Sequence, residues 1–119
     1  MQIPKPADAD RARFASLVPD DPRVEIKPMF GNIAAFVNGN MFMGLFGADI
    51  GVKLSPDEMA ALLAKPGAGP FGPPERPMGG YATLPASLST RSARTWAAKA
   101  LEHIAALPAK KARASAKRR

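Results

Sequence analysis

The apolar positions in the first half of the chain follow the two-residue period of β-strands. Residues 23–27 alternate strictly between apolar and charged side chains, as in a half-buried strand. Apolar runs at 32–37 and 41–46 flank Asn38-Gly39, the strongest short-range sign of a hairpin with a type I′ turn. A further apolar run at 49–54 follows a second short turn. These four segments are predicted to form an antiparallel meander.

Helical spacing dominates before and after this meander. Apolar residues recur at three- and four-residue steps in 8–18 and in about 90–107, which predicts a first and a last helix. Residues 55–65 begin with a helix-start signal, a serine followed by proline and two acids. A loop of five prolines and five glycines at 66–80 and a short strand at 81–84 come between the last two helices. This order predicts an α+β two-layer sandwich, with helices on one face of an antiparallel sheet.

Two-residue turns fix which side chains share a face of the predicted sheet. The face toward the helices is expected to carry Ala34, Phe36, Met41, Met43, Leu45, Ile50, Val52 and Leu54. The opposite face is expected to carry Ile33, Ala35, Val37, Phe42 and Phe46, together with a Gly44–Gly51 pair, beside Lys53 and Asp49.

The face opposite the helices should be polar if it meets water, but its predicted residues are apolar. Ile33, Val37, Phe42 and Phe46 form a candidate interface there for a homodimer or for another protein. The glycine pair would let a partner backbone approach closely. In the alternative interpretation, the first helix or the Pro/Gly loop folds back over this face.

Composition restricts the class of protein. The 119 residues are 46% hydrophobic and 23% charged, which fits one globular domain, expected at 1–109. No apolar run reaches the roughly 18 residues that span a membrane, and the N-terminal residues do not resemble a signal peptide. We therefore expect a cytoplasmic protein without a membrane partner.

The net charge of +7 is concentrated at the C-terminal end. Six of the 17 basic residues lie in 110–119, without an acidic residue: Lys110, Lys111, Arg113, Lys117, Arg118 and Arg119. This segment is predicted to be a disordered tail. It is either a solubilising terminus or a sequence-independent contact to nucleic-acid phosphates, which would be weak.

Signs of catalysis are weak. The absence of cysteine excludes thiolate chemistry and Cys-ligated metals, and the one histidine, His103, has no accompanying triad motif. The glycines at 67–72 follow a predicted helix, whereas a dinucleotide site requires a strand before them. We expect no enzyme, no catalytic residues, no cofactor and no metal.

Four strings, at 27–31, 36–42, 66–71 and 76–81, resemble in order and spacing the TfoX N-terminal domain family. The resemblance covers roughly residues 10–107. It implies a fold similar to that of type III secretion chaperones. The family's competence regulators assist the cAMP receptor protein and carry a second, helical domain, which has no counterpart here. The resemblance therefore implies a stand-alone version without catalytic residues.

Within this resemblance most matching residues have structural explanations, such as turns at Gly31 and Gly39. Arg76 differs, because a charged residue in a Pro/Gly loop needs a partner. It either pairs with an acidic residue or lines a small anion pocket with Tyr81. The leading hypothesis is a regulatory or accessory module that acts through protein contacts and is connected with competence or transcription. The alternatives are a nucleic-acid-binding protein that uses its tail and a small-ligand binder that uses Arg76.

Overall fold

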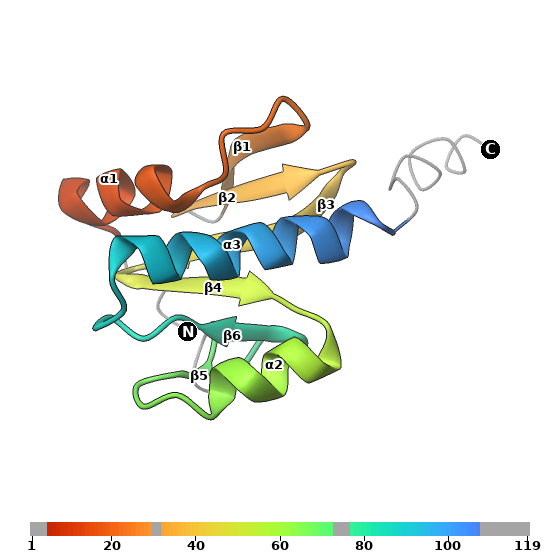
Figure 1. Cartoon of the computed structure of the whole chain (residues 1–119). Coiled ribbons are helices and arrows are strands. Elements are labelled where there is room, and N and C mark those ends of the chain that lie inside the picture. The colour runs from red at the N-terminus through yellow and green to blue at the C-terminus, as the bar shows by residue number, and fades with distance from the viewer. Residues whose placement is uncertain (1–4, 30–31, 73–76, 108–119) are drawn as a thin grey trace.

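The computed structural model describes residues 5–29, 32–72 and 77–107. Within these residues the chain forms a six-stranded antiparallel sheet, ordered β1-β2-β3-β4-β6-β5, with three helices packed on one side (Figure 1). The elements are α1 (Asp8–Leu17), β1 (Val24–Met29), β2 (Asn32–Val37), β3 (Asn40–Phe46), β4 (Asp49–Lys53), α2 (Pro56–Leu63), β5 (Gly69–Pro70), β6 (Tyr81–Thr83) and α3 (Thr90–Ala105). The predicted α+β architecture is confirmed, and the two-residue β5 is an addition inside the Pro/Gly loop.

Local side-chain caps explain where the helices begin. The Ser55 hydroxyl accepts a hydrogen bond from the Glu58 N–H at 3.3 Å, and the Ser89 hydroxyl accepts one from the Ser92 N–H at 3.1 Å. Both serines therefore satisfy main-chain donors that have no partner inside the helix. Asp10 serves α1 in the reverse direction, because its carboxylate accepts from the N–H of Ala7 at 2.8 Å.

The turns of the meander follow the sequence prediction. Asn38 and Gly39 have φ values of 54° and 80°, the left-handed pair that a type I′ turn requires. The turn between β3 and β4 is held by a side chain of β2, because the side-chain oxygen Oδ1 of the buried Asn32 accepts a hydrogen bond from the N–H of Gly47 at 2.9 Å. The predicted pairs Met43–Val52 and Leu45–Ile50 of β3 and β4 are confirmed.

A β-bulge between β2 and β3 overturns the predicted faces of β2. Phe36 pairs with Met41 as expected, but the next pair is Ala35–Met43, not Ala34–Met43. Phe42 is the additional residue, and a bulge of this kind shifts all later pairs by one position. Phe42 and Met43 are consequently both fully buried in the helix-side core.

The core lies between the sheet and the helices. All three helices contribute to one cluster of buried apolar residues, with Phe14 from α1, Leu62 from α2 and Trp96 from α3. The predicted apolar stripe of α3 is buried at Ala93, Trp96, Ala97, Ala100, Leu101 and Ile104. The opposite side of the sheet therefore has no helix on it (Figure 1).

Strand β1 forms one edge of the sheet. The N–H of Val24 is bonded to the Asp21 carbonyl at 3.0 Å and so does not serve the ladder with β2. In an antiparallel strand, the main-chain N–H and C=O groups of alternate residues point to opposite sides of the strand. The main-chain groups of Ile26 and Pro28 therefore also point to the outer edge, like those of Val24. Proline has no N–H to place there, and an edge is where a sheet tolerates it.

Candidate protein-contact surface on the helix-free face

We call the helix-free side of the sheet the open face. The strand pairing and the alternation of side chains define its members. They include Glu25, Lys27, Asn32, Ala34, Phe36, Met41, Gly44, Phe46, Asp49, Gly51, Lys53, Gly69, Tyr81 and Thr83. Three of them, Phe36, Phe46 and Tyr81, are half-buried aromatic residues.

Phe71, from the Pro/Gly loop, covers the centre of the open face. A Cβ built on Gly51 would clash with the Phe71 ring, at 2.3 Å from the nearest ring carbon, and one on Gly44 would lie 3.5 Å from the ring. The ring is only 2% exposed. The space above the glycine pair is thus filled by Phe71 of this chain and not by a partner's backbone. The Pro/Gly loop covers part of this face, as one of the two interpretations of the sequence expects.

Phe71 joins its neighbours in an aromatic cluster. Its ring centroid lies 6.4 Å from that of Phe46, nearly edge-on, and 6.1 Å from that of Tyr81. The Tyr81 hydroxyl donates to the Met41 carbonyl at 2.9 Å, which ties β6 to β3. Burial raises the pKa of the Tyr81 phenol to about 12, so the cluster stays uncharged at neutral pH.

Two lysines flank this cluster. The Nζ of Lys27 lies 5.1 Å above the Phe36 ring, and the Nζ of Lys53 lies 5.4 Å above the Tyr81 ring. Lys27 also lies 3.6 Å from the Glu25 carboxylate. Lys53 and Asp49 make no ion pair among the residues that the structure describes. The open face therefore combines a rigid aromatic centre with charges at its margins.

The predicted interface is wrong in the placement of three of its four residues. Val37 and Phe42 are fully buried in the helix-side core, and Ile33 packs against that core. The bulge at Phe42 is the physical reason, because it exchanges the faces of β2. Phe46 does lie on the open face. The prediction placed Lys53 on this face, where it lies, but it lacked Phe71 and Lys27, although the glycine pair signalled that something approaches closely.

Other predicted site residues lie outside the described part of the chain. These are Arg76 and the basic residues of the tail, Lys110, Lys111, Arg113, Lys117, Arg118 and Arg119. Tyr81, the predicted companion of Arg76, is a member of the aromatic cluster. The anion pocket and the nucleic-acid contact stay predictions.

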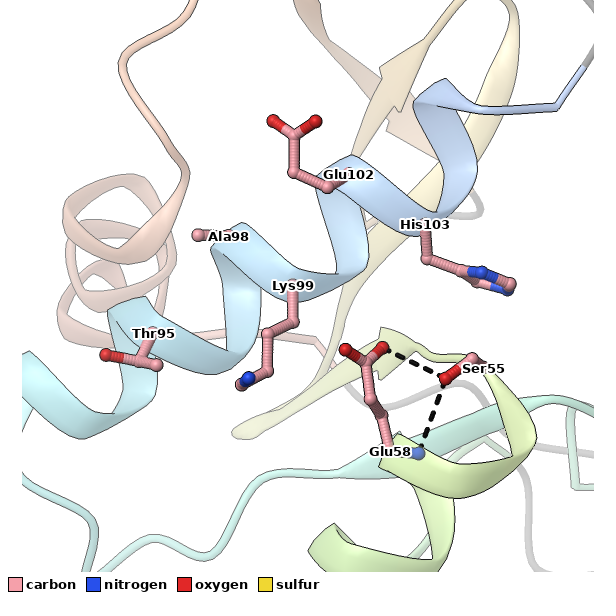
Figure 2. Close-up of a pocket in the computed structure, with 7 residues that line it drawn as sticks. All are labelled: Ser55, Glu58, Thr95, Ala98, Lys99, Glu102 and His103. Atoms are coloured by element: carbon pink, nitrogen blue, oxygen red, sulfur yellow. Dashed lines mark hydrogen bonds between the residues drawn. The ribbon is translucent and has the colours of Figure 1, made fainter.

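A groove of about 550 Å³ lies on the helix side, between α2 and α3 (Figure 2). Lys99 points from α3 toward Glu58 of α2, and His103 points toward Ser55. Ser55 and Glu58 are occupied with each other in the helix cap, since the Ser55 hydroxyl donates to the Glu58 carboxylate at 3.2 Å. Among the described residues His103 makes no hydrogen bond to Ser55, whose hydroxyl is engaged in the cap of α2. The described residues contain no group of three acids or histidines that could hold a metal ion.

Glu102, which also lines this groove, belongs to an ion-pair network. Arg23 donates to the Glu102 carboxylate at 3.1 Å and to both oxygens of Asp21 at 3.0 and 2.9 Å. The side-chain hydrogen bonds from Arg23 lower the pKa of Asp21 to about 2. The network links the start of β1 to α3, and this structural role accounts for its charged residues.

Comparison with known proteins agrees with the resemblance noted in the sequence. The model of the TfoX N-terminal domain matches residues 13–104, which is most of the chain. This chain belongs to the TfoX N-terminal domain family. The TfoX N-terminal domain is a regulatory domain family that is not known as catalytic. The searches of curated proteins and of solved structures returned no match. In this TfoX N-terminal domain, no helix of the described residues is long and apolar enough to cross a bilayer.

Proposed function

We propose that this TfoX N-terminal domain is a non-enzymatic regulatory or accessory module that acts through protein contacts on its open face. One observation carries the proposal: half-buried aromatic side chains gather on the one side of the sheet that no helix covers. Aromatic residues are enriched at protein interfaces, where they contribute large contact areas from few rotatable bonds. A connection with competence or transcription is part of this proposal and is supported by the family alone.

Affinity capture with surface variants tests the proposal. Phe46→Glu places a charge in the aromatic cluster of the open face while leaving the helix-side core intact. Lys99→Glu is the matched control, because it adds a carboxylate to an exposed site on the helix side. We expect the wild type and Lys99→Glu to capture the same proteins from cell extract, measured by quantitative mass spectrometry, and Phe46→Glu to lose them. An unchanged set with Phe46→Glu contradicts the proposal.

The basic residues of the tail support a second candidate function, sequence-independent binding of nucleic acid. Six charges on phosphates would give a slope of about −5 for log K against log salt, from about −0.9 for each contact. Removal of residues 110–119 should then abolish binding to a labelled DNA duplex in fluorescence anisotropy. If the truncated chain binds DNA with the same slope, the tail is not the binding element.

A further inference from the structure

We infer that the partner of the open face is a second copy of this chain, related by a two-fold axis parallel to the strands. This inference rests on the proposed function and adds the identity of the partner. It follows from the order of charges across the sheet, which the register fixes.

The open face is organised in three cross-strand rows. The middle row crosses the sheet through Lys27, Ala34, Gly44, Gly51 and Thr83. The first row, on the side of Phe36 and Tyr81, has Glu25 on β1 and Lys53 on β4. The third row has Phe46 and Asp49. Along this direction β1 therefore carries an acid and then a base, and β4 carries a base and then an acid.

This pattern is complementary to itself. A two-fold axis between β2 and β3 places β1 of one copy over β4 of the other and keeps the rows in order. Glu25 then faces the partner's Lys53, and Lys27 lies one row from the partner's Asp49. Packed sheets lie about 10 Å apart, a distance that a glutamate and a lysine span together. Within the described residues of one chain, Lys53 and Asp49 form no ion pair, so in the dimer each would gain an oppositely charged neighbour.

The shape of the open face is compatible with the same axis. Phe71 lies on the glycine pair and makes the half of the face over β3 and β4 protrude. The axis carries this raised half over β1 and β2 of the partner, where the middle row has the small side chain of Ala34. The two Phe71 rings are thus staggered. Phe36 of each copy faces Met41 of the other, so both halves of an isologous interface bury apolar surface.

Charge reversal with mixing tests this arrangement. In Glu25→Lys, two lysines face each other at both symmetric positions, and in Lys53→Glu two glutamates do. Each variant alone should raise the dimer dissociation constant by at least about tenfold, because facing like charges repel. An equimolar mixture should restore association, because the lysines at both positions of one chain then face the glutamates at both positions of the other.

The measurement is sedimentation equilibrium of the full-length chain over a range of concentrations, with one chain carrying a fluorescent label to identify the heterodimer. Phe46→Glu should also be monomeric, and Lys99→Glu should behave as the wild type. Far-UV circular dichroism checks that each variant is folded.

A wild type that stays monomeric overturns the inference, and so do single variants that associate as the wild type does or a mixture that stays monomeric. These outcomes leave the proposed function standing as long as protein capture depends on Phe46. Loss of that dependence alone contradicts the proposed function.

Discussion

The two faces of the sheet both carry large apolar side chains, but these are covered in different ways. On the helix side, Phe42, Met43 and Val52 are fully buried beneath three helices. On the open face, a single loop residue, Phe71, is buried over two glycines, and the aromatic residues around it stay half-buried. The apolar content of a strand thus does not identify the core, because the second layer decides which face becomes interior. A thinly covered face keeps apolar surface available for a partner.

The largest effect should separate the two faces by stability. Phe42→Ala removes a fully buried ring from the helix-side core and should lower the free energy of unfolding by about 3–5 kcal/mol. Phe46→Ala removes a half-buried ring and should cost about 1–2 kcal/mol, because less surface returns to water. Urea denaturation followed by Trp96 fluorescence measures both variants. Equal losses would contradict the distinction between the two faces.

The contact between Phe71 and the glycine pair should be sensitive to one methyl group. Gly51→Ala places a Cβ 2.3 Å from the nearest carbon of the Phe71 ring, so Phe71 must move, and we expect a loss of about 1–3 kcal/mol in the free energy of unfolding. Gly69→Ala is the control, because its Cβ would meet no atom within 4 Å.

A double-mutant cycle sharpens this test. In a Phe71→Ala background the added methyl group has room, so Gly51→Ala should cost less there than in the wild type. Additive losses in the two variants would show that the ring does not rest on Gly51.

The open face should set the alkaline limit of stability. The raised pKa of Tyr81 means that the folded state holds its proton up to about pH 12, whereas the unfolded chain releases it near pH 10. The contribution is therefore complete below pH 10 and is lost as the pH rises from 10 to about 12. Thermal unfolding of the wild type and of Tyr81→Phe across this range measures it. A wild-type curve parallel to that of Tyr81→Phe would contradict this assignment.

The helix side should contribute at the acid limit, with the smallest effect. The pKa of Asp21 is lowered from 3.8 to about 2 by Arg23, so its contribution is present above pH 4 and is lost as the pH falls toward 2. Asp21→Asn should flatten this part of the stability curve. Asp20→Asn, at an exposed neighbour, should leave it unchanged. If stability falls identically at low pH in the wild type and in Asp21→Asn, the ion pair does not contribute to acid stability.

Elements with local chemical signals could be predicted from the sequence. Asn38-Gly39 required a tight turn, Ser55-Pro56 started a helix, and the apolar stripe of α3 identified its buried side. In each case the residues that decide the structure are neighbours in the chain. The order of elements and the α+β architecture followed from these signals.

The faces of β2 could not be predicted, because the bulge has no polar marker. Met41, Phe42 and Met43 are three consecutive apolar residues, and strict alternation passes through them as easily as a bulge does. The error moved Ile33, Val37 and Phe42 to the wrong side. The Gly44–Gly51 pair correctly indicated a close approach, but nothing local identified Phe71, about twenty residues later, as the group that fills it.

The edge strand β1 has a consequence for behaviour at high concentration. Of the residues that address its outer side, Val24 has already used its N–H and Pro28 has none, which leaves Ile26 as the donor for any additional strand. A growing cross-β fibril needs a continuous row of such donors, and this edge interrupts the row at both ends. Edge-to-edge growth is therefore disfavoured at β1, and a two-fold dimer through the open face would leave this edge unchanged.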